Sequence, residues 1–163
     1  MIGVIVGDIV GSRFEWNNIK SKVFDFFSPD CVFTDNTVMS LAICDALLEN
    51  LDNPHELSKR SIMYLQEYGR RYPNAGYGGK FRDWLYSDDP QPYSSKGNGA
   101  AMRVSACGFL ADSLKQTKEH ARIVSEVTHS HPEGIKGAEA VACAVFLARS
   151  GKSIEYIKEF IIK

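Results

Sequence analysis

The sequence lacks several features that would at once narrow its class. It has no C-x-x-C pair, no apolar run long enough to span a bilayer, and almost no excess charge, with a formal net charge of -1. A near-neutral balance gives no electrostatic basis for binding nucleic acid or an acidic membrane surface, so we expect neither partner. The length of 163 residues fits one domain with a sizeable core, and we treat 1–163 as that domain.

The pattern of the cysteines and of the N-terminal residues predicts the cellular compartment of the protein. Cys31, Cys44, Cys107 and Cys143 are scattered, and three of them lie in apolar stretches with helical spacing. This pattern is typical of reduced, buried thiols. The first ten residues are apolar, but they contain Asp8 and lack the basic start of a signal peptide. We therefore expect a cytoplasmic protein without a membrane segment.

Strand patterns are nearly absent, and the apolar residues recur with a helical period, which predicts an all-α fold. Glycines 3, 7 and 11 share one face of the first segment, so we expect a buried helix that another helix approaches closely, with a strand as the alternative. Residues 17–31 look irregular. Further helices are expected over 34–51, from 54 to the proline at 73, and over 81–86, 100–111, 117–128, 132–150 and 154–163.

The run Thr34, Asp35, Asn36 and Thr37 opens the helix expected over 34–51. On its own it is typical of a helix N-terminus, where hydroxyl and carboxylate groups cap free amides and suit the dipole. The second interpretation is a cluster of hard oxygen ligands for Mg²⁺ or Mn²⁺. Such a cluster holds an ion only if other ligands arrive from elsewhere in the fold.

Glu15 lies between Phe14 and Trp16, just after the first segment. It is either an ordinary surface carboxylate or, in an apolar environment, a group whose raised pKa suits acid–base chemistry.

The loop Gly97-Asn98-Gly99 precedes a predicted helix, so its backbone can approach a ligand and the helix amides can meet a phosphate. No strand precedes this loop, which argues against a Rossmann site and leaves an ordinary loop as the alternative.

Two further segments could border a pocket. The pair His129 and His131 has the spacing of zinc ligands, but no third nitrogen or sulfur ligand follows at a suitable distance. We therefore favour histidines that line a pocket or bond to the backbone. The glycine cluster 76–79 is either a pocket border or a turn between helices.

The order of these motifs resembles the ADP-ribosylglycohydrolase family. Gly-Asp-x-x-Gly-Ser is followed by a Glu, then by Phe-Thr-Asp-x-Thr-x-Met, Gly-Asn-Gly-Ala-Ala-Met-Arg and Thr-His-Ser-His-Pro. The resemblance implies an all-α fold that binds ADP-ribose in a cleft with two divalent metals, usually Mg²⁺ or Mn²⁺. It implies hydrolysis of the glycosidic bond between ADP-ribose and an acceptor, and it leaves open whether that acceptor is arginine, serine or another group.

The resemblance also assigns residues. It implies metal ligands at Thr34, Asp35 and Asn36, catalytic roles for Glu15 and Asp35, and ADP-ribose contacts from the remaining motif positions, namely Gly97, Asn98, Gly99, Met102 and His131.

Two departures from the family pattern change the expectation. Asn36 stands where the family has a second Asp, and the C-terminal Asp-x-Asp-Thr motif is missing. We therefore expect one weakly held ion or none, and a fold that lacks the family's C-terminal helices. Apolar faces on helices 132–150 or 154–163 would then be exposed and favour a homodimer or a C-terminal partner chain. The alternatives to an active hydrolase are an impaired ADP-ribose-binding protein and a purely structural relative.

Overall fold

The fold is built from helices alone. In the computed structural model, residues 1–50 and 53–162 are described, and within them there are eight α-helices and no β-strand. The all-α prediction is confirmed. The helices are α1 (Ile2–Gly11), α2 (Asp35–Asn50), α3 (Pro54–Arg71), α4 (Gly79–Tyr86), α5 (Ser105–Leu110), α6 (Leu114–Glu126), α7 (Pro132–Arg149) and α8 (Ile154–Ile162), with short 3₁₀ turns η1 (Ser12–Phe14) and η2 (Ala101–Arg103).

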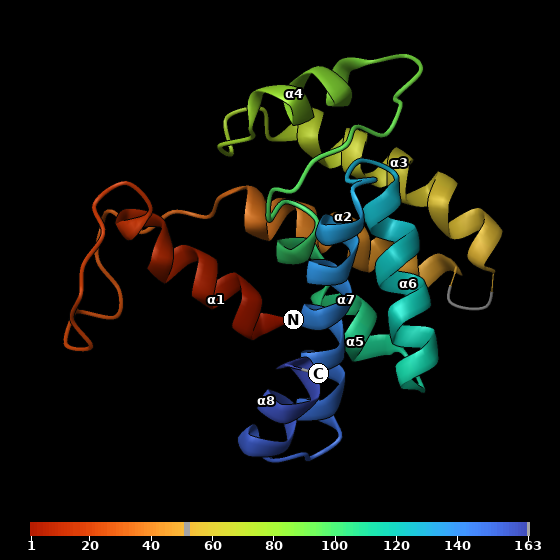
Figure 1. Cartoon of the computed structure of the whole chain (residues 1–163). Helices are drawn as coiled ribbons and strands as arrows, with labels where there is room; N and C mark the ends of the chain where they lie inside the picture. Colours follow the sequence, from red (N-terminus) through yellow and green to blue (C-terminus); the bar gives the residue numbers. More distant parts are fainter. Residues whose placement is uncertain (51–52, 163) are drawn as a thin grey trace.

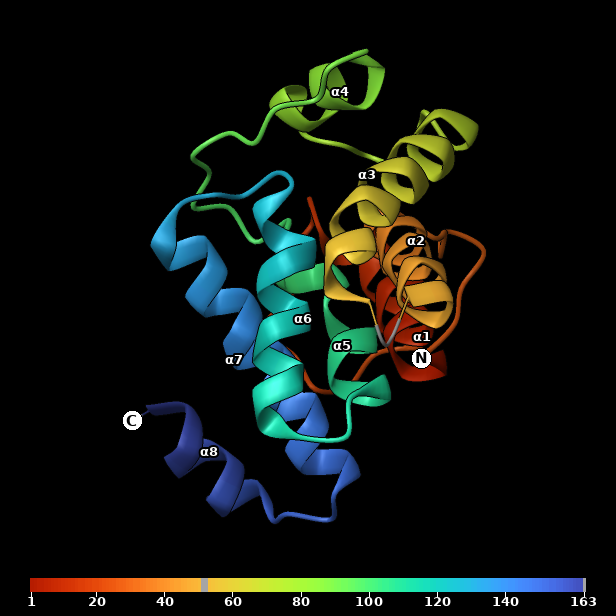
Figure 2. The ribbon, with the colours of Figure 1, turned by 90° about the vertical axis from the view of Figure 1, so that its right-hand side faces the viewer.

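Helix α2 lies at the centre of the core. It contacts α1, α3, α5 and η2, and it buries residues on several of its faces, including Met39, Ile43 and Leu47. The prediction of a largely buried helix is confirmed. Leu51, the last residue of the expected range, lies outside the described residues. Helices α6 and α7 form a second packed pair beside this centre (Figure 2).

Helix α1 differs from its prediction. It is a helix, but Val10 is its one buried residue among those described, and Ile2 is 78% exposed. A Cβ added at Gly3, Gly7 or Gly11 would meet no atom of the described residues within 4 Å, so none of the described helices packs closely on that face. The prediction that this helix is buried was wrong, because α1 runs outward from the centre, with the irregular segment 17–31 at its outer end (Figure 1).

The close helix approach occurs elsewhere, at Gly108 of α5. A Cβ at this position would lie 2.2 Å from the carbonyl oxygen of Ala142 in α7, so the absence of a side chain permits this packing. The predicted helix 100–111 is divided into η2 and α5, with Val104 between them. This division sets the direction of the chain after the loop 97–99.

The two C-terminal helices, α7 and α8, differ in how far their apolar residues are buried. The apolar residues of α7 are buried at Ile135, Ala138 and Ala142, whereas α8 has no buried residue and exposes Ile154 and Ile162.

All four cysteines are free thiols; Cys107 and Cys143 are buried, and the other two are half-buried. Among the described residues, no helix combines the length and apolar character that crossing a membrane requires.

Candidate functional site

Asp8 of α1 holds the beginning of α2. Its carboxylate accepts hydrogen bonds from the backbone amides of Thr34 and Thr37, at 2.7 and 3.1 Å, and from both threonine hydroxyls. These bonds satisfy amides that have no partner within the first turn of a helix. A residue 26 positions before Thr34 therefore caps α2 and fixes where Thr34, Asp35 and Asn36 lie.

Asp35 is positioned by a second contact. Its backbone amide donates to the carbonyl oxygen of Ala75 at 2.7 Å, which ties the start of α2 to the residue just before the glycine cluster 76–79. Burial, together with the nearby charges of Glu15 and Asp8, raises the pKa of the Asp35 carboxyl to about 6. Asp35 is thus an acid that changes protonation state close to neutral pH.

A cavity of about 340 Å³ opens beside Asp35. One side is the beginning of α4, and another is the loop 97–99 with the following η2. The aromatic rings of Phe81 and Tyr93 also border it. The cavity is lined by Asp35, Gly78, Gly79, Lys80, Phe81, Tyr93, Ser95, Gly97, Asn98, Gly99, Met102, Arg103 and His129.

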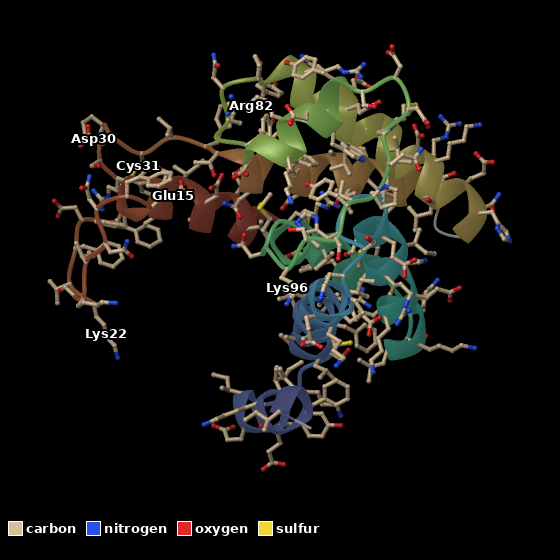
Figure 3. All side chains as sticks on the ribbon, turned by 45° about the horizontal axis from the view of Figure 1, so that its top comes forward. Glu15, Lys22, Asp30, Cys31, Arg82 and Lys96 are labelled. Atoms are coloured by element: carbon tan, nitrogen blue, oxygen red, sulfur yellow. The ribbon has the colours of Figure 1, made fainter. Side chains whose placement is uncertain are left out.

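A neighbouring hollow of about 430 Å³ lies between α1 and the start of α2. Glu15, Thr34 and Asn36 line it, together with Asp8 and Asn98. Asn98 also lines the first cavity, so the two hollows adjoin at this residue. Figure 3 shows Glu15, which follows η1 beyond the outer end of α1, and Lys96, which lies in the loop that precedes η2.

The fold therefore brings together most residues that the sequence singled out. Asp35, Gly97, Asn98, Gly99 and Met102 line the cavity, and Glu15, Thr34 and Asn36 line the hollow beside it. Their roles in binding and catalysis stay predictions. The glycine cluster 76–79 borders the cavity through Gly78 and Gly79 while also linking α3 to α4, so both of its interpretations apply.

His131 is placed differently from the pocket histidine that was expected. Its Nδ1 accepts from the amide of Glu133 at 3.1 Å and caps α7, and it is not among the described residues lining the cavity. His129 lines the cavity instead. Burial and the nearby Arg103 charge lower the pKa of His129 to about 4, so this histidine is neutral at physiological pH. A contact between His131 and a ligand is a prediction that this placement does not support.

The oxygen donors suit a hard cation in kind but are few in number. The Thr34 hydroxyl already donates to Asp8 and accepts from the amide nitrogen of Asn36 at 3.3 Å, which leaves the Asn36 oxygen as an acceptor. In the described part of the chain, no three His, Cys, Asp or Glu side chains are grouped so that they could hold a metal ion. Asp35, Thr34 and Asn36 are the residues that would hold one.

Asp8, Lys80 and Arg103 were missed as site residues in the sequence, whereas His129 was expected only in general terms, as one of two histidines that line a pocket or bond to the backbone. Asp8 was visible only as the one charge in an apolar segment, and His129 only as the partner of His131 in a pair. Lys80 and Arg103 carried no local pattern that pointed to a cavity. Their roles depend on contacts between segments far apart in the chain.

Comparisons with known proteins identify the family of this chain. A family model described as ADP-ribosylglycohydrolase matches residues 1–162. ADP-ribosylhydrolase ARH3 of Xenopus tropicalis is 30% identical over 179 residues, which cover 93% of this chain and 50% of that protein. The proteins of the same name from Mus musculus and Homo sapiens are each 28% identical over 189 residues, covering 94% of this chain and 49% and 50% of theirs. The chain spans about half the length of the curated relatives it matches.

Proposed function

Because the chain belongs to the ADP-ribosylglycohydrolase family, we propose that its cavity binds an ADP-ribosyl group and that its site hydrolyses the glycosidic bond between ADP-ribose and an acceptor. One observation carries the proposal. An acid at the start of a helix, Asp35, and the glycine loop 97–99 line the same cavity. The names of the relatives state an ADP-ribosylhydrolase activity for those proteins, which supports the same activity here.

The cavity suits a diphosphate. The loop 97–99 carries no bulky side chain at its two glycines, so its backbone can lie against a ligand. Lys80 and the amino-terminal end of α4 border the same cavity, and both favour negative charge. Phe81 and Tyr93 supply aromatic surface for a base or a ribose.

The acidic groups suit the bond-breaking step. Breaking a glycosidic bond builds positive charge at the anomeric carbon, and a nearby carboxylate stabilises that charge. With a pKa of about 6, Asp35 can also accept a proton from the attacking water at neutral pH. A divalent ion, when bound to Thr34, Asp35 and Asn36, would polarise the water and the ribose hydroxyls. Glu15 borders the adjoining hollow and is the second carboxylate of the proposed site.

The small number of grouped acidic side chains favours a second candidate function. With no grouping of three such ligands in the described residues, the chain alone would hold at most one ion weakly. A catalytically impaired ADP-ribose-binding protein is therefore the alternative. A second copy or a separate C-terminal chain that adds carboxylates would restore the hydrolase, and the exposed apolar residues of α8 would suit such a partner. The four free thiols support a cytoplasmic location.

Two measurements test the proposal. Calorimetric titration with ADP-ribose, with and without Mg²⁺, should give a saturable binding isotherm, and the absence of binding in both would overturn the proposed site. Incubation with ADP-ribosyl-arginine and ADP-ribosyl-serine substrates in excess Mn²⁺ should release ADP-ribose if the chain is a hydrolase. Binding without release would favour the impaired binder, and light scattering of the same sample would show whether a dimer forms.

A further inference from the structure

Arg103 is a buried arginine that lines the cavity. Its side chain is 1% exposed, and no ion pair joins it to an acidic residue within the described part of the chain. Its Nη2 donates to the carbonyl oxygen of Val124 at 2.9 Å and to Oγ1 of Thr128 at 2.7 Å, and its guanidinium lies over the ring of Phe81. A buried charge without a counter-charge is costly. In the low dielectric of the protein interior, this charge also strongly polarises the polar groups that it contacts.

Thr128 passes this polarisation to His129. The Thr128 oxygen accepts from Arg103, so its single hydroxyl proton goes either to the carbonyl oxygen of Ser125 at 3.4 Å or to Nδ1 of His129 at 2.8 Å. The shorter distance favours His129. The charge favours it too, because the guanidinium attracts the lone pair of Nδ1 and would repel an Nδ1–H group.

We propose that Arg103 is a positioning residue that acts through Thr128 to hold His129 in the tautomer with its proton on Nε2. His129 then presents Nε2–H as a neutral donor to a hydroxyl or phosphate oxygen of the ligand. That the ligand is an ADP-ribosyl group depends on the proposed function, whereas the tautomer does not.

The opposite edge of the imidazole lies against the glycine loop. A Cβ at Gly99 would be 3.0 Å from both Cε1 and Nε2 of His129, and a Cβ at Gly97 would be 4.0 Å from Nε2. The loop backbone therefore borders the edge that carries the proposed donor. Burial and the charge of Arg103 lower the pKa of His129, so its ring stays neutral at this place.

The backbone on both sides of His129 is also held. The Tyr93 amide donates to the Thr128 carbonyl at 2.7 Å, and the Ser130 amide donates to the Tyr93 carbonyl at 3.3 Å. These two bonds form an isolated parallel β-bridge between Tyr93 and His129. The ring of Tyr93 also contacts the imidazole of His129, with centroids 5.5 Å apart. The ring can then keep one orientation while its tautomer is set by Thr128.

Long-range ¹H–¹⁵N NMR of the whole chain without ligand tests the tautomer directly. We expect Nδ1 of His129 at the shift of an unprotonated nitrogen and Nε2 at that of a protonated one. Thr128→Val, which removes the hydroxyl at similar volume, should mix the two tautomers, and Thr128→Ser, the matched control, should keep the wild-type pattern. Arg103→Gln should also mix them, and the Thr128 pair decides the question if that variant does not fold. An Nδ1–H tautomer in the wild type, or an unchanged pattern in Thr128→Val, would overturn the proposal.

A binding measurement separates this proposal from the proposed function. Thr128→Val should weaken ADP-ribose binding by about tenfold relative to Thr128→Ser, the loss expected for one hydrogen bond. Equal affinities of the two variants would show that the donor is not used by the ligand and would overturn that part of the proposal. No binding by the wild type with the expected tautomer would reject ADP-ribose as the ligand and leave the positioning role of Arg103 supported.

Discussion

The carboxylate of Asp8 accepts hydrogen bonds from both the amide and the hydroxyl of Thr37, at 3.1 and 2.5 Å, across 29 residues of chain. Together with the matching pair from Thr34, this contact makes α1 the cap of α2. The capped turn contains Asp35, the acid beside the cavity. The stability of the core helix and the geometry of the site therefore share one residue.

Asp8→Ala should lower the free energy of unfolding by about 2 to 4 kcal/mol, because it leaves several donors at the start of α2 without an acceptor. Urea denaturation followed by circular dichroism measures this change. Asp88→Ala, in the exposed loop after α4, is the control and should change stability by less than about 0.5 kcal/mol. Equal effects of the two substitutions would contradict the capping role.

Asp35→Asn should make stability less dependent on pH. Because the pKa of Asp35 is raised from 3.8 to about 6 in the folded chain, the folded state holds its proton more tightly than the unfolded state. The free energy of unfolding then falls as pH rises through this window, and the cost of the charge is fully present above it. In metal-free buffer we expect Asp35→Asn to be more stable than the wild type at pH 8 by about 1 to 2 kcal/mol, a range reduced for solvent screening, and equal to it at pH 3. A difference that is the same at both pH values would contradict the raised pKa.

Asn36→Asp should strengthen cation binding. The substitution replaces a neutral amide oxygen with a carboxylate next to Asp35, and affinity for hard cations rises with the charge of the ligands. Calorimetric titration with Mn²⁺ should show an increase in affinity of about tenfold or more over the wild type. Asn50→Asp, at the other end of α2, adds the same charge away from the site and should leave Mn²⁺ affinity unchanged. An unchanged affinity in Asn36→Asp would show that position 36 does not contact the ion.

Gly108→Ala should destabilise the packing of α5 on α7 by about 2 to 3 kcal/mol, because its Cβ would overlap the carbonyl oxygen of Ala142. Gly137→Ala is the matched control inside α7. A Cβ there would meet nothing within 4 Å in the described part of the chain, so the higher helix propensity of alanine should stabilise the protein by about 0.5 to 1 kcal/mol. Thermal unfolding of both variants measures the two effects, and the same sign for both would contradict the close approach.

The sequence predicted the helices well where their signals are local. Asn53 caps α3 through the amide of Glu56, and proline opens both α3 and α7, as the sequence indicated. The burial of α1 could not be predicted, because an apolar, glycine-spaced helix has the same sequence whether or not another helix covers it. The division at Val104 was also missed, since it depends on how the preceding loop meets α2 and α7 rather than on local propensity.

By itself, the sequence determined the all-α class, the family and the local groups that form the site: the oxygen-rich start of α2, the glycine loop 97–99 and a pair of histidines. The family follows from the resemblance carried by the order of the motifs. The all-α class and the local groups follow from short-range physics, since helical period, capping and glycine freedom are properties of neighbouring residues. Only the tertiary structure decided that Asp8 caps α2 and that His129 rather than His131 borders the cavity. The buried charge of Arg103 beside Thr128 is decided there as well, because such contacts join segments whose distance in the chain carries no record of their distance in space.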